Sequence, residues 1–108
     1  MKLSELEEKL SLKRLTCSEA DREINSCYIS DLLSRVLGGC QSGDIWITVQ
    51  ASINMVAVAV MTDAACVILP EDLTAPVNVI EKAVEEELTI FTSPDSAYSI
   101  AKQLASLL

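Results

Sequence analysis

Histidine is missing from this chain, aromatic residues are scarce, and basic residues are half as numerous as acidic ones. Without histidine, proton transfer near neutral pH would need a carboxylate, cysteine or lysine whose pKa is strongly shifted. The absence also removes the cysteine and histidine spacing of a zinc finger, so we expect no metal site and no cofactor. One Trp, two Tyr and one Phe leave the core to Val, Ile, Leu, Ala and Met, which suits layered α/β packing.

The charge balance and the lack of long apolar runs exclude further classes. Sixteen acidic against eight basic residues give a net charge of −8, which repels phosphate backbones and anionic headgroups. Nucleic acid and membrane surfaces are therefore not expected as partners. The longest unbroken apolar run, Met55 to Met61, has seven residues, whereas a spanning helix needs about twenty. The start of the sequence lacks a secretory or transit signal, so we expect a cytoplasmic protein.

The 108 residues fit one domain, which we expect to span 1–108. In the first part, Ser4 and Glu7 form a capping box before a short helix, and a brief strand covers Lys13 to Thr16. Ser18 to Asp21 is typical of a turn, and Ile24 to Ile29 of extended chain. A helix from about Asp31 to Leu37 then has Ser30 as its N-cap and Gly38-Gly39 as its end.

The second part alternates strands and helices. Apolar runs predict strands at Ile45–Val49, Cys66–Leu69 and Leu88–Phe91. Helices are expected at Ile53–Met61, at Val77–Glu87 after Pro76, and at Asp95–Leu107 after Ser93-Pro94. The pattern predicts a single three-layer α/β/α domain with a mostly parallel (mixed) sheet of about five strands. Because few elements can cover the edges of that sheet, we expect a homodimer.

Two motifs suggest chemistry and have simpler explanations. Gly38 to Gly43 has the glycine spacing of a phosphate loop, but Asp44 stands where the loop needs lysine, which favours a turn before a strand. The four cysteines, Cys17, Cys27, Cys40 and Cys66, are expected to be reduced and buried or half-buried thiols. An alternative is that Arg22 activates Cys17 or Cys27 as a thiolate, although no general base is evident.

Asp21-Arg22 is open to two interpretations. In the first it is a structural tether, with Asp21 capping backbone amides and Arg22 paired with a carboxylate such as Asp31. In the second, a ligand pocket lies at the carboxyl ends of the strands, where open α/β sheets bind ligands, and the N-terminus of the helix at Asp95 could receive an anion. The candidate pocket residues are Arg22, Tyr28, Ser30, Asp31, Thr48, Gln50, Thr92 and Ser93.

A set of segments covering nearly the whole chain resembles the DRTGG domain, which occurs alone or joined to CBS domains and to phosphotransacetylase-type enzymes. These segments are Asp21-Arg22, Tyr28 with Ser30 to Ser34, Gly43 to Gln50, Asn54 to Ala59, Ile80 to Ala83, and Thr92 to Pro94 with Ser96-Ala97. The family is similar in fold to the N-terminal domain of HPr kinase/phosphorylase. The kinase chemistry of that enzyme lies in a separate phosphate-loop domain. The chain departs from many relatives at Ser26-Cys27, where they have Gly-Gly, and at Pro70-Glu71-Asp72, where they have a loop with glycine.

The resemblance implies a non-catalytic regulatory or ligand-sensing module that binds a nucleotide-like ligand or a phosphorylated metabolite. The alternative is a structural or adaptor subunit that docks on a larger metabolic or redox enzyme complex as its protein partner. A third hypothesis is an enzyme that uses Cys27 or Asp31.

Overall fold

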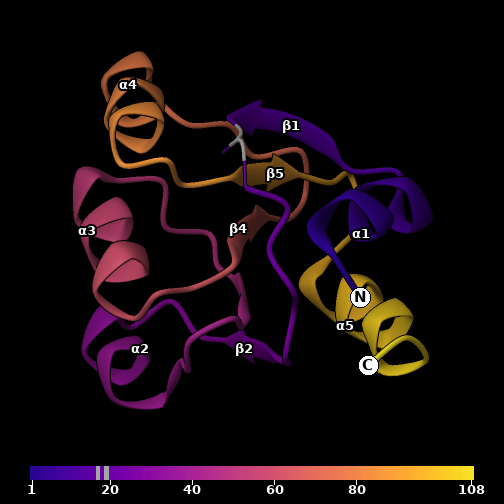
Figure 1. The fold of residues 1–108 in the computed structure, drawn as a ribbon. Helices are drawn as coiled ribbons and strands as arrows, with labels where there is room; N and C mark the ends of the chain where they lie inside the picture. Colours follow the sequence, from indigo (N-terminus) through magenta and orange to yellow (C-terminus); the bar gives the residue numbers. More distant parts are fainter. Residues whose placement is uncertain (17, 19) are drawn as a thin grey trace.

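A five-stranded sheet runs through the centre of the molecule and separates two layers of helices (Figure 1). The computed structural model describes residues 1–16, 18 and 20–108. The expectation for Cys17, and part of the turn expected at Ser18 to Asp21, therefore lie outside the described residues. The elements are α1 (Leu3–Leu10), β1 (Lys13–Thr16), β2 (Cys27–Ile29), α2 (Leu33–Gly39), β3 (Ile45–Ile47), α3 (Ile53–Met61), β4 (Cys66–Leu69), α4 (Val77–Glu85), β5 (Ile90–Thr92) and α5 (Ala97–Ala105).

The strand order is β1-β5-β4-β3-β2, so β1 and β2 form the two edges. The strands β2, β3, β4 and β5 are parallel, and each is joined to the next by one helix, while β1 is antiparallel to β5. This mixed α/β architecture confirms the predicted fold class. The four parallel strands finish at one end of the sheet, which we call its carboxyl end. The opposite end, where these strands begin, is its amino end.

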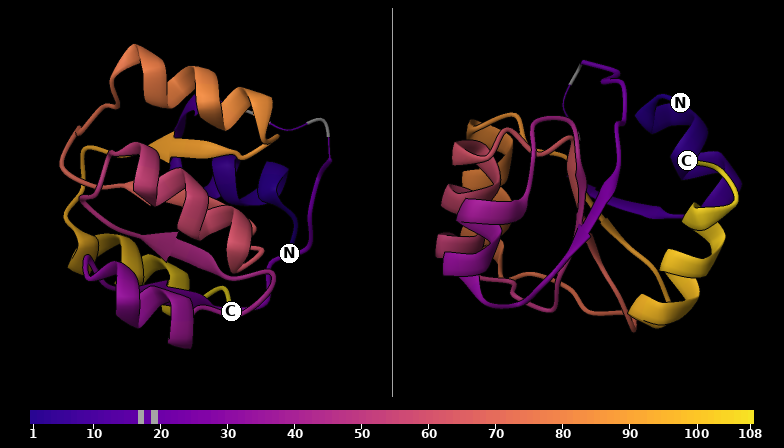
Figure 2. Two further views of the ribbon diagram at one scale, coloured as in Figure 1. Left: turned by 90° about the vertical axis from the view of Figure 1, so that its left-hand side faces the viewer. Right: turned by 90° about the horizontal axis from the view of Figure 1, so that it is seen from below.

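Alternate residues of the strands face two separate apolar cores, one on each side of the sheet. Trp46, Val67 and Ile90 face the core under α2, α3 and α4. Ile47 and Phe91 face the core under α1 and α5. Figure 2 shows the three layers, with the three crossover helices on one side of the sheet and α1 and α5 on the other. The strands β3 and β4 are buried along their whole length, as their unbroken apolar sequences predict.

The predicted N-cap of the first helix is wrong. The helix α1 begins at Leu3, and Ser4 lies in its first turn. The carboxylate of Asp21 accepts hydrogen bonds from the backbone N–H of Ser4, at 2.9 Å, and from its hydroxyl, at 2.6 Å. Asp21 therefore stabilises the start of α1 from outside the helix, which is the capping part of the tether interpretation.

The helix α2 also differs from its predicted bounds. It begins at Leu33, since the Asp31 carboxylate binds Thr48 and Val49, just after β3, instead of the first turn. Gly38 and Gly39 are the last two residues of α2, and Cys40 is its C-cap. A Cβ at Gly39 would meet the Tyr28 ring at 2.5 Å, so this glycine permits a close approach of β2 and α2. The remaining elements match their predictions except at their ends, where assignments from sequence are least certain.

The glycine segment before β3 forms the turn that was favoured over a phosphate loop. Gly43 has φ +83°, a left-handed conformation that glycine adopts without strain. The buried Asp44 carboxylate accepts a hydrogen bond from the backbone N–H of Gln41 at 2.8 Å. Asp44 thus closes the turn and is directed at protein backbone.

Candidate functional site

Asp31, Thr48 and Gln50 form a connected hydrogen-bond network at the carboxyl end of β2 and β3. The Asp31 carboxylate accepts from the Thr48 hydroxyl at 2.8 Å and from the Val49 backbone N–H at 2.9 Å. The Gln50 side-chain amide donates to the Asp31 carbonyl at 3.1 Å, and the Gln50 backbone N–H donates to the Thr48 hydroxyl at the same distance. Thr48 is buried, whereas Asp31 is exposed. One charged side chain therefore faces solvent from a rigid polar base.

Ser30 borders this network, whereas the Tyr28 side chain bonds elsewhere. The Ser30 hydroxyl accepts from the Leu32 backbone N–H at 3.2 Å, and its carbonyl accepts from the Trp46 indole N–H at 2.9 Å. The Tyr28 hydroxyl donates to the Arg35 carbonyl at 3.2 Å, so the ring lies against α2. The structure thus brings Ser30 to Asp31 and directs Tyr28 toward the helix layer.

Thr92 and Ser93 lie at the same end of the sheet, but β4 separates their strand from β3. The Thr92 hydroxyl donates to the Leu73 carbonyl at 2.7 Å, and the Ser93 hydroxyl accepts from the Asp95 backbone N–H at 3.1 Å. The Thr92 bond, together with bonds from the N–H groups of Glu71 and Asp72 to the carbonyls of Asp95 and Ser93, holds the loop after β4 against the end of β5. In that loop Glu71 and Asp72 have φ values of 59° and 58°, so two carboxylate residues adopt the conformation that glycine favours.

The carboxyl end of the sheet is acidic. Four carboxylate residues, Asp31, Glu71, Asp72 and Asp95, follow its parallel strands, and the intervening loop sequences contain no lysine or arginine. Near β2 and β3 a free phosphate group would meet a carboxylate and no lysine or arginine from these loops, because Lys13, at the same end of the sheet, lies on the opposite edge strand. Groups that donate hydrogen bonds, such as sugar hydroxyls and exocyclic amines, or a divalent cation, match these carboxylates better.

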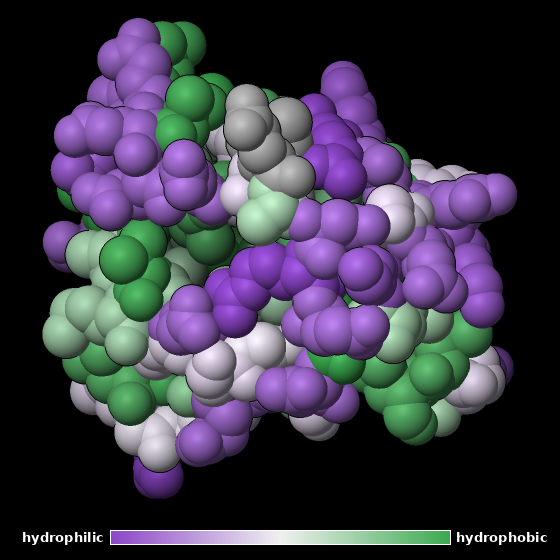
Figure 3. Space-filling view, viewed as in Figure 1, coloured by the Kyte–Doolittle hydropathy of each residue, from purple (hydrophilic) through white to green (hydrophobic). Residues whose placement is uncertain are grey.

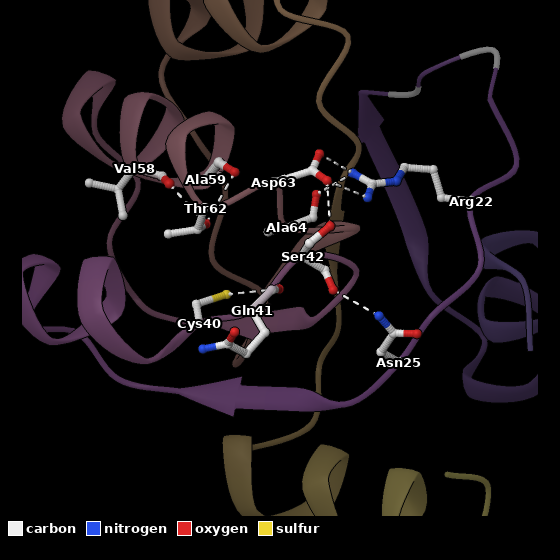
Figure 4. Close-up of polar contacts among 10 residues, drawn as sticks. All are labelled: Arg22, Asn25, Cys40, Gln41, Ser42, Val58, Ala59, Thr62, Asp63 and Ala64. Carbon is white, nitrogen blue, oxygen red and sulfur yellow. Dashed lines mark hydrogen bonds and ion pairs between the residues drawn. The ribbon is translucent and has the colours of Figure 1, made fainter.

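Arg22 lies at the opposite, amino end of the sheet (Figure 4). Its guanidinium makes a bidentate pair with Asp63, with N–O distances of 3.0 and 3.1 Å, and it also donates to the Ala64 carbonyl at 3.1 Å. The expected pairing with Asp31 is therefore made with Asp63 instead. The structure separates Arg22 from the other candidate residues, which lie at the carboxyl end or, for Tyr28, on the α2 face.

Asp63 is the centre of a cluster that joins three segments of the amino end. The Ser42 hydroxyl donates to its carboxylate at 2.5 Å, and the Asn25 side chain donates to the Ser42 carbonyl at 2.8 Å. The hydrogen bond from Ser42, followed by the Arg22 guanidinium, lowers the pKa of Asp63. The cluster ties the segment before β2 to the turn before β3 and to the end of α3, as Figure 4 shows.

A surface hollow of about 310 Å³ lies beside this pair. Arg22, Asp63, Glu86 and Glu87 supply its charged groups, and aliphatic groups of α3 and the chain before β5 supply the rest. Because the guanidinium is already bound by Asp63 and further carboxylates line the wall, the hollow does not suit an anionic ligand. The geometry of Arg22 favours a tether.

The backbone of Asp63 explains why the tether is built at this position. Asp63 has φ 57° and follows the end of α3; its N–H donates to Val60, and the N–H of Ala64 donates to Ala59. This is the Schellman ending of a helix, in which glycine usually takes the left-handed position. Glu87 holds the same position after α4, with φ 58° and equivalent bonds.

These two helix ends provide a matched test of the tether. Glu87→Gly should raise the free energy of unfolding by up to about 1 kcal/mol, because it relieves a left-handed side chain. Asp63→Gly gains the same relief but loses the Arg22 pair and the Ser42 hydrogen bond, and we expect a net loss of about 1 kcal/mol. Arg22→Ala should show a similar loss. Urea unfolding measures all three.

The pH dependence of the stability of a fourth variant, Asp63→Asn, provides the control. Since the folded-state pKa of Asp63 is lowered, its stabilisation is present above the unfolded pKa of about 3.9 and disappears as pH falls through the folded value. The difference between wild type and Asp63→Asn should therefore shrink below about pH 4. A difference that is unchanged at pH 3, or an Asp63→Gly as stable as Glu87→Gly, contradicts the tether.

The described cysteines are unsuited to nucleophilic chemistry. Cys27, Cys40 and Cys66 are free thiols, as expected. Burial, and then the nearby Asp44 carboxylate, raises the pKa of Cys27 to about 11, and burial likewise raises the pKa values of Cys40 and Cys66. Thiolates are the reactive form, so these thiols are poor nucleophiles near neutral pH. In the part of the chain that the structure describes, no cluster of three metal-ligating side chains occurs, and no helix is long and apolar enough to cross a bilayer.

Sequence reasoning missed Asp63 and Ser42. Asp63 lies two residues after the last residue of the apolar helix α3, at a place where glycine would be usual, and this was the one available signal. Ser42 carried no signal, because serine is common in turns for local reasons.

The chain is similar in structure to a regulatory region of known structure. That structure contains the CBS and DRTGG domains of the regulatory region of Clostridium perfringens pyrophosphatase, complexed with the activator diadenosine tetraphosphate. The TM-score is 0.76 at 16% sequence identity, and the match covers 98% of this chain and 46% of that chain. No protein-family model matches the chain, and no curated protein matches it. At this identity the likeness is one of fold: the chain has a DRTGG-like α/β fold and spans less than half of the regulatory region that shares it.

Proposed function

We propose that this chain is a non-catalytic regulatory module that senses a nucleotide-like ligand. The observation that carries the proposal is that 98% of the chain matches the fold of a regulatory region, and that region was crystallised with a nucleotide activator. The raised thiol pKa values agree with a role without catalysis. The expected cytoplasmic location and homodimer belong to the same proposal.

The polar network at the carboxyl end of β2 and β3 is the ligand site that we propose. Asp31 offers an exposed carboxylate, and Gln50 lies beside it on a base fixed by Thr48. A ribose or base that donates hydrogen bonds to Asp31 would fit this charge, and phosphates would point to solvent or bind through a divalent cation. A nucleoside group is therefore the part of the ligand recognised, and a compound that offers only phosphate should bind poorly.

A second candidate function is that of an adaptor subunit. Ile53, Val60 and Met61 expose 40%, 42% and 72% of their surfaces on α3, a helix made almost entirely of apolar residues. Figure 3 shows hydrophobic surface over this helix, on the left of the view. Exposed apolar faces of this kind favour docking on a partner such as a larger metabolic or redox enzyme complex.

A thermal-shift titration tests ligand sensing, with adenosine and diadenosine tetraphosphate as probes, each with and without Mg²⁺. A ligand that binds only the folded state at 100 times its Kd adds about 2.7 kcal/mol, which for a domain of this size raises Tm by about 10 °C. Adenosine should raise Tm without Mg²⁺, and Mg²⁺ should increase the effect of the tetraphosphate.

Asp31→Asn is the test variant, because it keeps an oxygen for the Thr48 hydroxyl and the Val49 N–H but removes the charge. Glu81→Gln, on the exposed side of α4, removes the same charge far from the network and is the control. We expect Asp31→Asn alone to lose most of the shift. If no nucleoside or nucleotide changes the Tm of the wild type, ligand sensing is wrong, and co-purification of one stoichiometric partner would then support the adaptor.

A further inference from the structure

The outer edge of β2 is open. Among the described residues β2 pairs with β3 alone, and Figure 1 shows it at the border of the sheet, with α2 on one face and α5 on the other. The Ser26 carbonyl accepts from the Ile45 N–H at 2.8 Å and so points into the sheet. Because peptide groups alternate along a strand, the N–H and C=O groups of Cys27 and Ile29 point outward.

An apolar groove of about 520 Å³ runs beside this edge. It is lined from β2 by Ser26, Cys27 and Ile29, and from α5 and the chain end by Ala101, Leu104, Ala105 and Leu108. An added strand could therefore satisfy the outward backbone groups and place alternate side chains in the groove, which is the usual arrangement of strand addition.

The two edges of the sheet differ in protection. The edge strand β1 contains Lys13 and Arg14, Arg14 is bound to Glu7 at 2.6 Å, and a register irregularity lies between Arg14 and Thr16. Charges and bulges of this kind prevent strand pairing between molecules. In contrast β2, with the sequence Cys-Tyr-Ile, has no charge, proline or bulge.

The charge distribution favours a second copy of this chain as the occupant. All sixteen carboxylate residues lie outside α2, β2 and α5, whose charged residues are Arg35 and Lys102 alone. Two copies with a net charge of −8 repel each other least when these elements meet.

Apolar side chains are exposed on both sides of the edge. Leu32 and Leu37 are 60% and 47% exposed on the α2 side, and Ile29 and Leu108 are 50% and 46% exposed on the α5 side. Figure 3 shows hydrophobic surface at the lower right, over the C-terminal helix. A bound peptide would cover the groove only, whereas a second copy also brings its α2 beside the first and covers the other side.

We propose that β2 is the dimer interface of this chain and pairs antiparallel with β2 of a second copy, about a two-fold axis at Tyr28. Cys27 then faces the partner's Ile29, Tyr28 faces the partner's Tyr28, and the outward N–H and C=O groups of both strands form four hydrogen bonds. The five-stranded sheets join into one continuous sheet across the interface. This inference gives the proposed homodimer its surface and does not depend on the ligand.

Light scattering coupled to gel filtration tests the interface. The wild type should have twice the 11.7 kDa chain mass, and Ile29→Asp should have the mass of one chain. The control is Val77→Asp, which places the same charge at a 74% exposed apolar position on α4 and should leave the dimer intact. A monomeric wild type overturns the proposal and leaves the edge to an extended peptide. A dimeric Ile29→Asp also overturns it, because the variant would bury one aspartate from each copy in the apolar interface.

A disulfide tests the register. Directly opposed hydrogen-bonded residues have Cα atoms about 5.5 Å apart, within the range of a disulfide. Ile29→Cys should therefore form a covalent dimer with the partner's Cys27 when oxidised glutathione takes up the two electrons and two protons. The same substitution combined with Cys27→Ser should form none, and equal cross-linking in both variants overturns the register. Nucleotide-induced stabilisation should persist in monomeric Ile29→Asp, so failure of the interface and failure of ligand sensing remain distinguishable.

Discussion

Trp46→Ala is expected to lower the free energy of unfolding by about 3–5 kcal/mol, the largest effect of any single change considered for this chain. Trp46 is the only tryptophan, lies in the interior strand β3, and is fully buried against the helices α2 and α3. Its removal leaves a cavity in a core that contains no other large aromatic residue except the partly buried Tyr28. Since natural domains have about 5–15 kcal/mol in total, the variant should be partly unfolded at 37 °C. Circular dichroism during urea unfolding measures the loss.

Trp46→Phe separates the volume of the ring from its hydrogen bond. The indole N–H donates to the Ser30 carbonyl at 2.9 Å and thereby joins β3 to the end of β2. Phenylalanine keeps most of the apolar contact but leaves this carbonyl without its donor, so we expect a loss of about 1–3 kcal/mol. If Trp46→Phe is as unstable as Trp46→Ala, the hydrogen bond outweighs the packing and the cavity argument is wrong.

Thr16→Val should cost about 2–4 kcal/mol although the two side chains have nearly the same shape. The buried Thr16 hydroxyl donates to the Leu88 carbonyl and accepts from the Ile90 N–H at 3.0 Å, at the point where the register between β1 and β5 shifts. Valine leaves both buried backbone groups without a partner. Urea unfolding with an unchanged m-value would identify the change as one of stability.

Thr16→Ser is the matched control for that experiment. Serine keeps the hydroxyl and loses one methyl group, which should cost about 1 kcal/mol. The order of stability should be wild type, then Thr16→Ser, then Thr16→Val. A Thr16→Val protein that is more stable than Thr16→Ser would mean that the hydroxyl has no role in holding β1 to the sheet.

The sequence was sufficient for the fold because its signals come from burial. Unbroken apolar runs such as Cys66–Leu69 occur where a strand is covered on both faces, and the matching helix Ile53–Met61 was placed at its observed bounds. Element ends were less accurate because they depend on partners distant in sequence. Asp31 leaves the first turn of α2 for Thr48 and Val49, and Asp21 stabilises α1 from outside the helix.

The grouping of the candidate residues was anticipated in part. The rule that ligand sites form where parallel strands finish placed Ser30, Asp31, Thr48 and Gln50 at one end of the sheet, and the structure brings them together there. That they bind a ligand stays a prediction. No such rule places Arg22, because its long side chain reaches a carboxylate 41 residues away whose direction is set by the left-handed end of α3. The acidity of the loops at the carboxyl end could have been recognised by counting their charges.

The pairing of β1 with β5 has a consequence for how the chain folds. The strands β2, β3 and β4 lie within one segment of the sequence, with a helix in each connection, whereas Thr16 meets Ile90 across 74 residues. Closing so long a loop is entropically unfavourable until the intervening strands have assembled. During synthesis β1 is made first yet has no place in the sheet until residue 92 has left the ribosome, so the first strand of the chain is the last to be incorporated.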